Sequence, residues 1–307
     1  MPVYNTPAAM LERAVQSILD QTFDDFEFLI LDDGRTEVSV GDYLAALPRD
    51  RRVRLIRRAH TGITATLNAG LLLAKGEWIA RQDDDDWSDL ARLQRQIEFV
   101  RENPNIILLG TSAWTHQQSG RPLWPVSMPQ SHAEICGAFH QRRPFIHGST
   151  LFRRSAALSL GGYRREFLSA QDLDFFWRMT EVGESANLAE PLYHYRYRGD
   201  SVSGQRANEQ RIAAGAAHIL AEARRNGQPE AVEEALREAA DPLACGDAES
   251  AALKQADHLM LAGCYRQAWR AYSAILRGSR GNPLVWGKLA RLGIFRFVPP
   301  VRSLCFR

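Results

Sequence analysis

The 307-residue sequence predicts an α/β protein: a mixed, Rossmann-like sheet followed by an all-helical C-terminal extension. Three observations lead to this fold class. Up to about residue 110, short apolar runs alternate with segments of helical periodicity. From residue 111 to about 205, short strands surround one helix, and beyond residue 205 only helical patterns remain. The composition, with 45% hydrophobic and 24% charged residues, is globular and excludes a disordered, collagenous or coiled-coil chain.

The first 110 residues alternate strands and helices. Ala8 to Gln21 has apolar residues at helical intervals, whereas Phe26 to Leu31 is an apolar run of strand length interrupted only by Glu27. The further elements expected here are strands at 3–4, 53–56, 78–80 and 106–109 and helices at 63–74 and 90–100. A β-α-β-α series implies parallel strands with helices on both faces, and ligands bind at the carboxyl ends of such strands.

The rest of the chain changes character twice. The elements expected after residue 110 are strands at 149–152 and 192–197, a helix at 173–181, and helices at 211–225, 230–239, 251–262 and 266–276. We therefore expect a domain boundary near residue 205, with a first part over residues 1–205 whose pattern changes near residue 110. Residues 206–307 form the helical extension, which ends in a basic tail.

The near-neutral net charge of +2 conceals an uneven distribution. Residues 258–307 carry nine Lys or Arg and no Asp or Glu, so the remainder has 29 basic and 36 acidic residues. The overall balance argues against nucleic acid as a partner. The tail, with apolar Leu292, Phe295 and Phe297 beside Arg291 and Arg296, suits either an anionic membrane surface or a solvated helical cap.

Targeting and cysteine signals indicate a cytoplasmic protein. No apolar stretch approaches the roughly 20 residues of a membrane span, and the first residues have no signal-peptide pattern. The four cysteines are far apart and predict neither a disulfide framework nor a zinc site.

Four consecutive carboxylates, Asp83 to Asp86, follow the strand expected at 78–80. Two carboxylates about 4 Å apart repel by about 4 kcal/mol at an effective dielectric near 20. The cluster is therefore either a solvated turn before the next helix or a site for a hard divalent ion, Mg²⁺ or Mn²⁺, shared with a diphosphate. Asp32 and Asp33 also follow a strand, and they indicate either a tight turn or contacts with a nucleotide base or ribose.

Six motifs in order resemble the family 2 glycosyltransferases, which have the GT-A fold. They are Met1 to Asn5, Ser17 to Phe23, Leu29 to Gly34, Gly62 to Gly70 with Asn68, Gly76 to Asp86, and Gly161 to Tyr163 followed by Ala170 to Asp172. The resemblance covers residues 1 to about 205 and implies a catalytic domain there, with a nucleotide half at about 1–110 and an acceptor half at about 111–205. It implies an inverting hexosyl- or N-acetylhexosaminyltransferase of bacterial surface polysaccharide synthesis. It also implies a longer first strand, so we expect that the true start lies upstream of Met1 or that this sheet edge is frayed.

The resemblance assigns roles residue by residue. Asp172 matches the catalytic base and stands near the start of a helix, whose dipole favours an ionised carboxylate. Asp85 matches the direct metal ligand of the Asp-x-Asp motif, with Asp83 as its other end. The expected nucleotide-binding residues are Pro2, Tyr4, Asn5, Asp32, Asp33, Asn68, Asp83, Asp84, Arg196 and Arg198. The two arginines suit phosphate geometry, or alternatively they form a snorkelling pair on an edge strand, with their charged ends in water.

The implied reaction explains these residue types. An acceptor hydroxyl attacks the anomeric carbon of a nucleotide sugar, with a UDP-sugar as the expected donor, while Asp172 accepts the hydroxyl proton. A divalent cation and basic side chains stabilise the departing diphosphate. The expected acceptor is a glycan or a lipid-linked sugar, and the basic tail would hold the protein at the inner face of the membrane. The alternative is a non-catalytic subunit that binds sugar nucleotides or acts as a scaffold.

Overall fold

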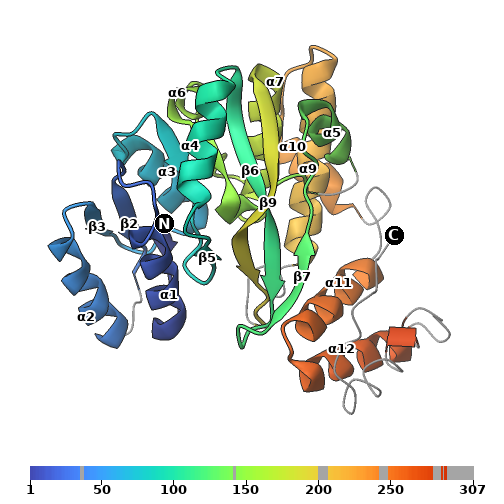
Figure 1. The fold of residues 1–307 in the computed structure, drawn as a ribbon. Coiled ribbons are helices and arrows are strands. Elements are labelled where there is room, and N and C mark those ends of the chain that lie inside the picture. The colour runs from blue at the N-terminus through green and yellow to red at the C-terminus, as the bar shows by residue number, and fades with distance from the viewer. Residues whose placement is uncertain are drawn as a thin grey trace.

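The computed structural model describes residues 1–34, 38–140, 143–199, 207–241, 248–278, 285 and 287–288, which form two sheets flanked by helices (Figure 1). The strands are β1 (Pro2–Val3), β2 (Phe28–Asp32), β3 (Val53–Arg57), β4 (Trp78–Ala80), β5 (Trp87–Ser88), β6 (Ile106–His116), β7 (Pro122–Val126), β8 (Leu151–Arg153) and β9 (Glu184–Arg196). The helices are α1 (Ala8–Leu19), α2 (Val38–Ala46), α3 (Ile63–Leu73), α4 (Arg92–Glu102), α5 (His132–Ala138), α6 (Arg154–Ser159), α7 (Gln171–Val182), α9 (Ala207–Arg225), α10 (Val232–Ala240), α11 (Ala248–Leu261) and α12 (Tyr265–Gly278), with short 3₁₀ turns η1 (Leu47–Arg49) and η2 (His147–Ser149).

The first sheet is parallel, as predicted, with the order β1-β2-β3. Its central strand β2 is buried along its whole length, which explains the apolar run that marks it in the sequence. Val3, Leu11, Val15 and Ile30 belong to the apolar cluster that joins this sheet to α1. Burial of this cluster fixes the carboxyl ends of β1 and β2 side by side.

The second sheet is mixed, with the order β4-β8-β6-β9-β5 and β7 paired to β6. β6 and β9 are parallel, whereas β8 is antiparallel to both β4 and β6. The mixed sheet of the predicted fold class is thus confirmed. However, β4 does not continue the parallel series of the first three strands, because it pairs antiparallel with β8.

Two strands are longer than their apolar runs. β6 extends to His116 through Thr111 and Ser112, which are fully or almost fully buried. β9 begins at Glu184 and includes buried Asn187, whose side-chain amide donates to the carbonyl oxygens of Pro129 and Pro144. The Asn187 Oδ1 atom, by contrast, is buried without a hydrogen-bond partner. Because these strand positions are polar, hydrophobicity alone does not reveal them.

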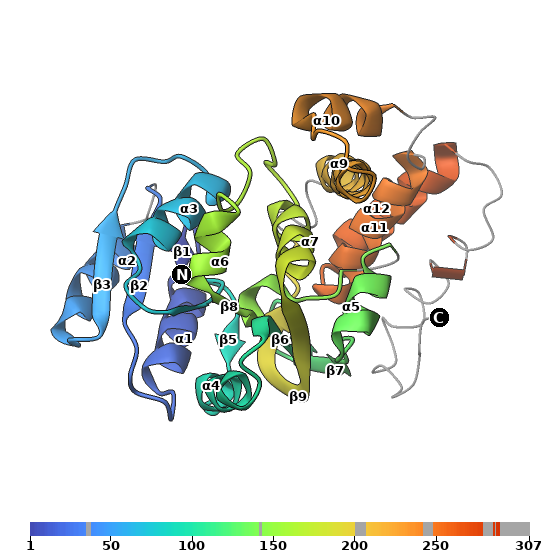
Figure 2. The ribbon, with the colours of Figure 1, turned by 90° about the horizontal axis from the view of Figure 1, so that it is seen from above.

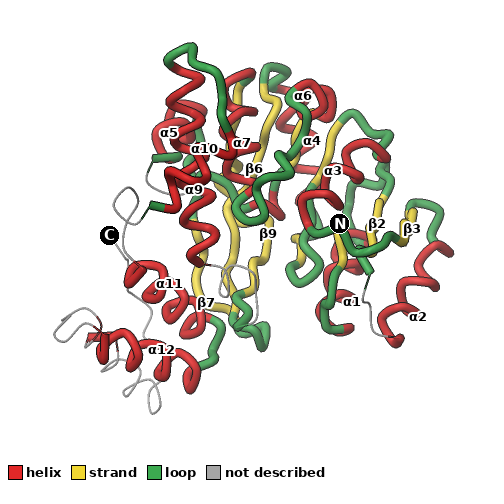
Figure 3. Tube along the Cα trace, turned by 180° about the vertical axis from the view of Figure 1, so that it is seen from behind, coloured by secondary structure: helices red, strands yellow, loops and turns green. Residues whose placement is uncertain are grey.

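The C-terminal helices lie beside the second sheet, away from the first (Figures 1 and 2). α9 and α10 contribute to the same apolar cluster as α7, whereas α11 and α12 pack on each other around Ala256, Ala268 and Tyr272. The helices predicted from residue 211 onward are confirmed as elements. The view from behind shows helices on both sides of the central strands (Figure 3). The proposed domain boundary near residue 205 stays a prediction.

Within the described part of the chain, no helix is both long and apolar enough to cross a bilayer. The tail residues proposed to contact a membrane, 289–307, lie outside the described residues.

Candidate functional site

Arginines accompany two members of the acidic cluster, which lies between β4 and β5. The Arg81 guanidinium lies 2.6 Å from Asp83 Oδ1, and the Arg198 guanidinium lies 3.2 Å from Asp85 Oδ2. Arg81 directly precedes the cluster in sequence, whereas Arg198 comes from just beyond β9. Two elements far apart in the chain therefore supply positive charge to the same segment.

The other two carboxylates connect this segment to backbone amides. Asp84 accepts the backbone N–H of Tyr4 at 3.1 Å and the hydroxyl of Thr6, so it ties the end of β1 to the acidic cluster. Asp86 is buried and accepts the backbone N–H of Arg196 at 2.7 Å. The cluster thus joins the carboxyl ends of β1 and β9, and a freely solvated turn is excluded.

Burial and mutual repulsion both disfavour the ionised forms of these carboxylates. Burial, followed by the charges of Asp84 and Asp83, raises the pKa of Asp85 to about 7, although Arg198 acts in the opposite direction. Burial also raises the pKa of Asp84 and Asp86. The side chain of Asp85 still keeps 22% of its surface exposed, so an ion could reach it. A nearby cation would favour the ionised carboxylates.

A divalent cation fits this donor set only with help from a ligand. Among the described residues, no three His, Cys, Asp or Glu side chains are grouped so as to hold a metal. The oxygen donors of Asp83 and Asp85 are the type that Mg²⁺ or Mn²⁺ prefers, and their excess charge suits a cation. A diphosphate and water would have to supply the remaining ligands, and metal binding stays a prediction.

Arg196 and Arg198 lie at the same edge as the acidic cluster, as their predicted role requires. Arg196 is buried, and its guanidinium lies over the ring of Trp87, 5.0 Å from the ring centroid. Its Nε atom is buried without a hydrogen-bond partner. The alternative of a snorkelling pair does not fit Arg196, because its guanidinium Nε is buried and not in water. Phosphate contacts by either arginine stay predictions.

The second acidic pair has a different environment. Asp33 is buried and accepts the backbone N–H groups of Thr61 at 3.0 Å and Gly62 at 2.9 Å, just before α3 begins. Burial alone would raise the pKa of Asp33, but hydrogen bonds from Thr61, Thr66 and Gly62 outweigh it and lower this pKa. Asp32 lies beside it at the end of β2 and is also buried. In this structure Asp33 thus caps the N-terminal end of α3.

The residues after β1 form the rim next to this pair. Pro2 is a buried residue of β1, Tyr4 is 37% exposed, and Asn5 is exposed with a left-handed φ of 52°. The Tyr4 ring stacks on His60 with centroids 4.3 Å apart, and His60 Nδ1 lies 3.0 Å from Asp33 Oδ2. Their contacts with a base stay predictions.

The side chain of Asn68 forms hydrogen bonds with the backbone of Tyr163. Its Nδ2 donates to the Tyr163 carbonyl oxygen at 2.7 Å, and its Oδ1 accepts the Tyr163 N–H at 2.9 Å. The side-chain amide therefore clamps the Gly161–Tyr163 motif to α3. A direct nucleotide contact by Asn68 stays a prediction.

Asp172 lies in the first turn of α7, as predicted from the sequence. Ala170, which precedes the helix, adopts a left-handed φ of 51°, an uncommon conformation for a residue with a Cβ atom. The Asp172 side chain is 10% exposed, and its Oδ2 lies 3.4 Å from the Arg143 guanidinium. Arg143 therefore orients this carboxylate, whose role as the base stays a prediction.

A buried aromatic layer supports the floor of the site. His147 Nε2 lies 3.0 Å from the Tyr163 hydroxyl, and burial lowers the pKa of His147 to about 3, so this ring is neutral at pH 7. The Tyr193 hydroxyl accepts the backbone N–H of Asp83. A Cβ added at Gly148 would lie 1.9 Å from the Tyr193 oxygen and 2.5 Å from Asp83 Oδ2. Gly148 therefore lets the backbone pass close to both Tyr193 and Asp83.

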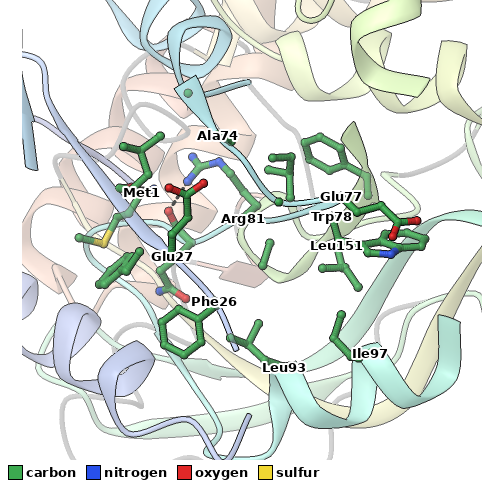
Figure 4. Close-up of a pocket in the computed structure, with 18 of the residues that line it drawn as sticks. Met1, Phe26, Glu27, Ala74, Glu77, Trp78, Arg81, Leu93, Ile97 and Leu151 are labelled. Atoms are coloured by element: carbon green, nitrogen blue, oxygen red, sulfur yellow. Dashed lines mark hydrogen bonds between the residues drawn. The ribbon is translucent and has the colours of Figure 1, made fainter. Parts of the chain in front are cut away.

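A cavity of about 600 Å³ lies between the first sheet, β4 and α4 (Figure 4). Its lining is mainly apolar and includes Met1, Trp78 and Leu151, with Arg81 as a charged member. Asp85 and Asp172 do not line it. The cavity therefore adjoins the acidic edge through Pro2 and Arg81, whereas the candidate metal ligand and base lie outside it.

Sequence reasoning missed several partners at this edge. Arg81, Thr6, Tyr193 and Arg143 contact the predicted carboxylates or their backbone. Only Arg81 offered a local signal, because it directly precedes the acidic run. The other three are brought in by the fold.

Comparisons with known proteins agree with the geometry. The family model described as glycosyl transferase family 2 matches residues 1–161. Glycosyltransferase EpsE of Bacillus subtilis is 31% identical over 209 residues, which cover 66% of this chain and 73% of EpsE. The amylovoran biosynthesis glycosyltransferase AmsE of Erwinia amylovora is 25% identical over 206 residues, covering 64% of this chain and 74% of AmsE.

Solved structures share the fold. S. aureus TarS in complex with UDP-GlcNAc matches with a TM-score of 0.56 and 17% identity, over 96% of this chain and 87% of that one. The mannosyltransferase PcManGT from Pyrobaculum calidifontis, in complex with GDP-Man and Mn²⁺, matches with a TM-score of 0.52 and 15% identity, over 97% and 79%.

Proposed function

The chain belongs to glycosyltransferase family 2 and has the GT-A fold, and we propose that it transfers a sugar from a nucleotide sugar to an acceptor with inversion at the anomeric carbon. The observation that supports this best is the meeting of three chain segments at one edge. Asp84 joins that edge to the end of β1, whereas Asp85 and Asp86 join it to Arg198 and Arg196 around the end of β9.

The proposed reaction uses residues of this chain in distinct roles. Asp172 accepts the proton of the attacking hydroxyl, and Arg143 orients its carboxylate. Arg196 and Arg198 stabilise negative charge on the departing diphosphate. Asp83 and Asp85 would hold Mg²⁺ or Mn²⁺, which when bound supplies further electrostatic stabilisation to that leaving group.

The expected donor and acceptor follow from the relatives. TarS is solved with UDP-GlcNAc, which supports a UDP-sugar as donor, and PcManGT with Mn²⁺, which supports a divalent cofactor. The name of AmsE supports a role in bacterial surface polysaccharide synthesis, with a glycan or lipid-linked acceptor at the cytoplasmic face of the membrane. A screen of UDP-hexoses and UDP-N-acetylhexosamines as donors would identify which of the two sugar classes is transferred.

The test is a pair of measurements on Asp172→Asn. Thermal shift with UDP-sugars and Mn²⁺ should show that the variant still binds the donor, because Asp172 lies outside the proposed nucleotide contacts. Its transfer rate should fall about 10²-fold or more, since general-base catalysis contributes on that order. Asp24→Asn, which removes the same charge at an exposed position, is the control.

A sugar-transfer rate in Asp172→Asn equal to that of the wild type would show that Asp172 is not the catalytic base. Wild-type protein that binds the donor, yet never releases nucleoside diphosphate with or without acceptor, would establish the alternative of a non-catalytic binding subunit.

A further inference from the structure

A second cavity, of about 520 Å³, lies beside the proposed base. α7, α9 and α11 surround it, together with the segment that follows α5. Its polar lining consists of His140, Arg143, Gln210, Arg211, His218 and Lys254. Arg143 also contacts Asp172, so the cavity adjoins the carboxylate that would receive the acceptor's proton.

The lining has one sign of charge. Arg143, Arg211 and Lys254 carry positive charge at neutral pH, and His140 and His218 become positive when protonated. None of the described residues that line the cavity is Asp or Glu. Leu173 and Phe139 supply apolar surface, against which a charge interacts more strongly than in open water.

The basic side chains in this cavity lower one another's pKa. The Lys254 side chain is exposed overall, but its surroundings desolvate the amine and lower its pKa, and Arg143 lowers it further while Asp172 opposes both. Burial lowers the pKa of His218, and the neighbouring His140, with ring centroids 5.3 Å apart, adds to this effect. Burial and mutual repulsion therefore disfavour the charged forms of these side chains, and a bound anion would favour them.

Within the described part of the chain, Asp172 is the carboxylate that pairs with Arg143, at 3.4 Å, and it partly neutralises this guanidinium group. Arg211, on α9, donates to Asn208 and to the Ala239 carbonyl oxygen, which hold its guanidinium group beside the cavity. His140 accepts from Arg225, which brings a further positive charge to the rim.

We propose that this cavity binds a phosphate or pyrophosphate group of the acceptor, adjacent to the hydroxyl that Asp172 deprotonates. Guanidinium groups match the geometry of phosphate oxygens, and an ammonium group adds a mobile point charge. The inference rests on the proposed transfer function and deepens it, because it defines the acceptor as anionic. A lipid pyrophosphate and a phosphorylated saccharide share this chemistry.

The binding test uses inorganic phosphate, titrated calorimetrically into protein saturated with UDP and Mg²⁺ so that the donor site is filled. Lys254→Gln should weaken phosphate binding at least fivefold relative to wild type. Lys75→Gln removes the same charge from an exposed position that does not line the cavity, and it should bind phosphate as the wild type does. Arg211→Gln is a second cavity variant and should weaken binding in the same direction.

Two results would overturn the proposal: wild-type protein that takes up no phosphate once UDP is bound, or equal phosphate affinity in Lys254→Gln and Lys75→Gln. Failure of the transfer function looks different. A protein that binds no UDP but binds phosphate with this dependence on Lys254 would keep the anion site and lose the proposed reaction.

Competition then distinguishes the two sources. Farnesyl pyrophosphate and a sugar 1-phosphate are each added against bound phosphate, with wild type and Lys254→Gln in parallel. Stronger competition by farnesyl pyrophosphate identifies a lipid carrier, and stronger competition by the sugar phosphate identifies a phosphorylated glycan. In either case the competitor should displace less phosphate from Lys254→Gln than from wild type. Equal displacement from the two proteins would contradict the proposed site.

Discussion

Two acidic motifs follow strands in this chain, and their carboxylates have opposite electrostatics. At Asp33, hydrogen bonds from the amides ahead of α3 lower the pKa, whereas at Asp85 burial and neighbouring carboxylates raise it to about 7. Both motifs resemble family nucleotide-binding motifs, yet one carboxylate is satisfied by the protein itself and the other is not. The number and type of donors that the fold supplies decide which carboxylate is available for a cation.

The contrast separates stability from activity. A carboxylate fully bonded within the protein stabilises the fold, because replacing it leaves buried N–H groups unsatisfied. A carboxylate that is crowded by like charges contributes little to stability and is suited to a ligand of opposite charge. Substitutions at the two sites should therefore have different principal effects.

The largest effect is expected for Asp85→Asn on activity. Loss of the proposed metal ligand should reduce sugar transfer at least about 10²-fold, the range seen when one group that stabilises a developing charge is removed. Unfolding free energy should change by less than about 1 kcal/mol, since the Asp85–Arg198 pair is partly exposed and repulsion is relieved. Transfer assays across a Mn²⁺ series and chemical denaturation measure both. Strong destabilisation would abolish the contrast.

A smaller effect is expected for Asp33→Asn, and it concerns stability. The amide group cannot accept on both sides, so at least one of the N–H groups of Thr61 and Gly62 loses its partner. The expected loss is about 1–3 kcal/mol in the free energy of unfolding. Urea denaturation measures it, with Asp24→Asn as an exposed control, and equal stability of the two variants would refute the capping role.

The smallest effect is the pH dependence of that loss. Because folding lowers the pKa of Asp33 from its ordinary value of 3.8, its stabilisation is complete above that value and disappears as the pH falls through the lowered, folded-state pKa. The stability gap between wild type and Asp33→Asn should therefore be constant near neutrality and narrow only below about pH 4. A gap that widened on acidification would show the opposite linkage.

Much of the fold could be predicted from hydrophobic spacing. The helices α1, α4 and α7 have a clear helical periodicity. Buried Thr111 and Asn187 concealed the full length of β6 and β9. α5 was missed although Ser131 and Glu134 form a capping box, the signal that marks its start.

Of the candidate site, only the acidic residues could be predicted from the sequence. Asp83 to Asp86 and Asp172 stand out in the chain by type and position. Their partners do not, because Thr6, Arg143 and Arg198 reach them through long-range contacts that depend on how β1, α7 and β9 pack. The sign of the pKa shift at each carboxylate depends on those partners, so it could not be inferred from the motif.

Gly148 gives the site a simple marker in sequence comparison. A side chain at this position would meet the Tyr193 hydroxyl and Asp83 within 2.5 Å, so the aromatic floor and the acidic edge tolerate only hydrogen there. A homologue with a larger residue aligned to Gly148 must have moved or replaced one of the two neighbours. One column of an alignment would thus sort relatives that keep this arrangement of the acidic edge from those that have diverged from it.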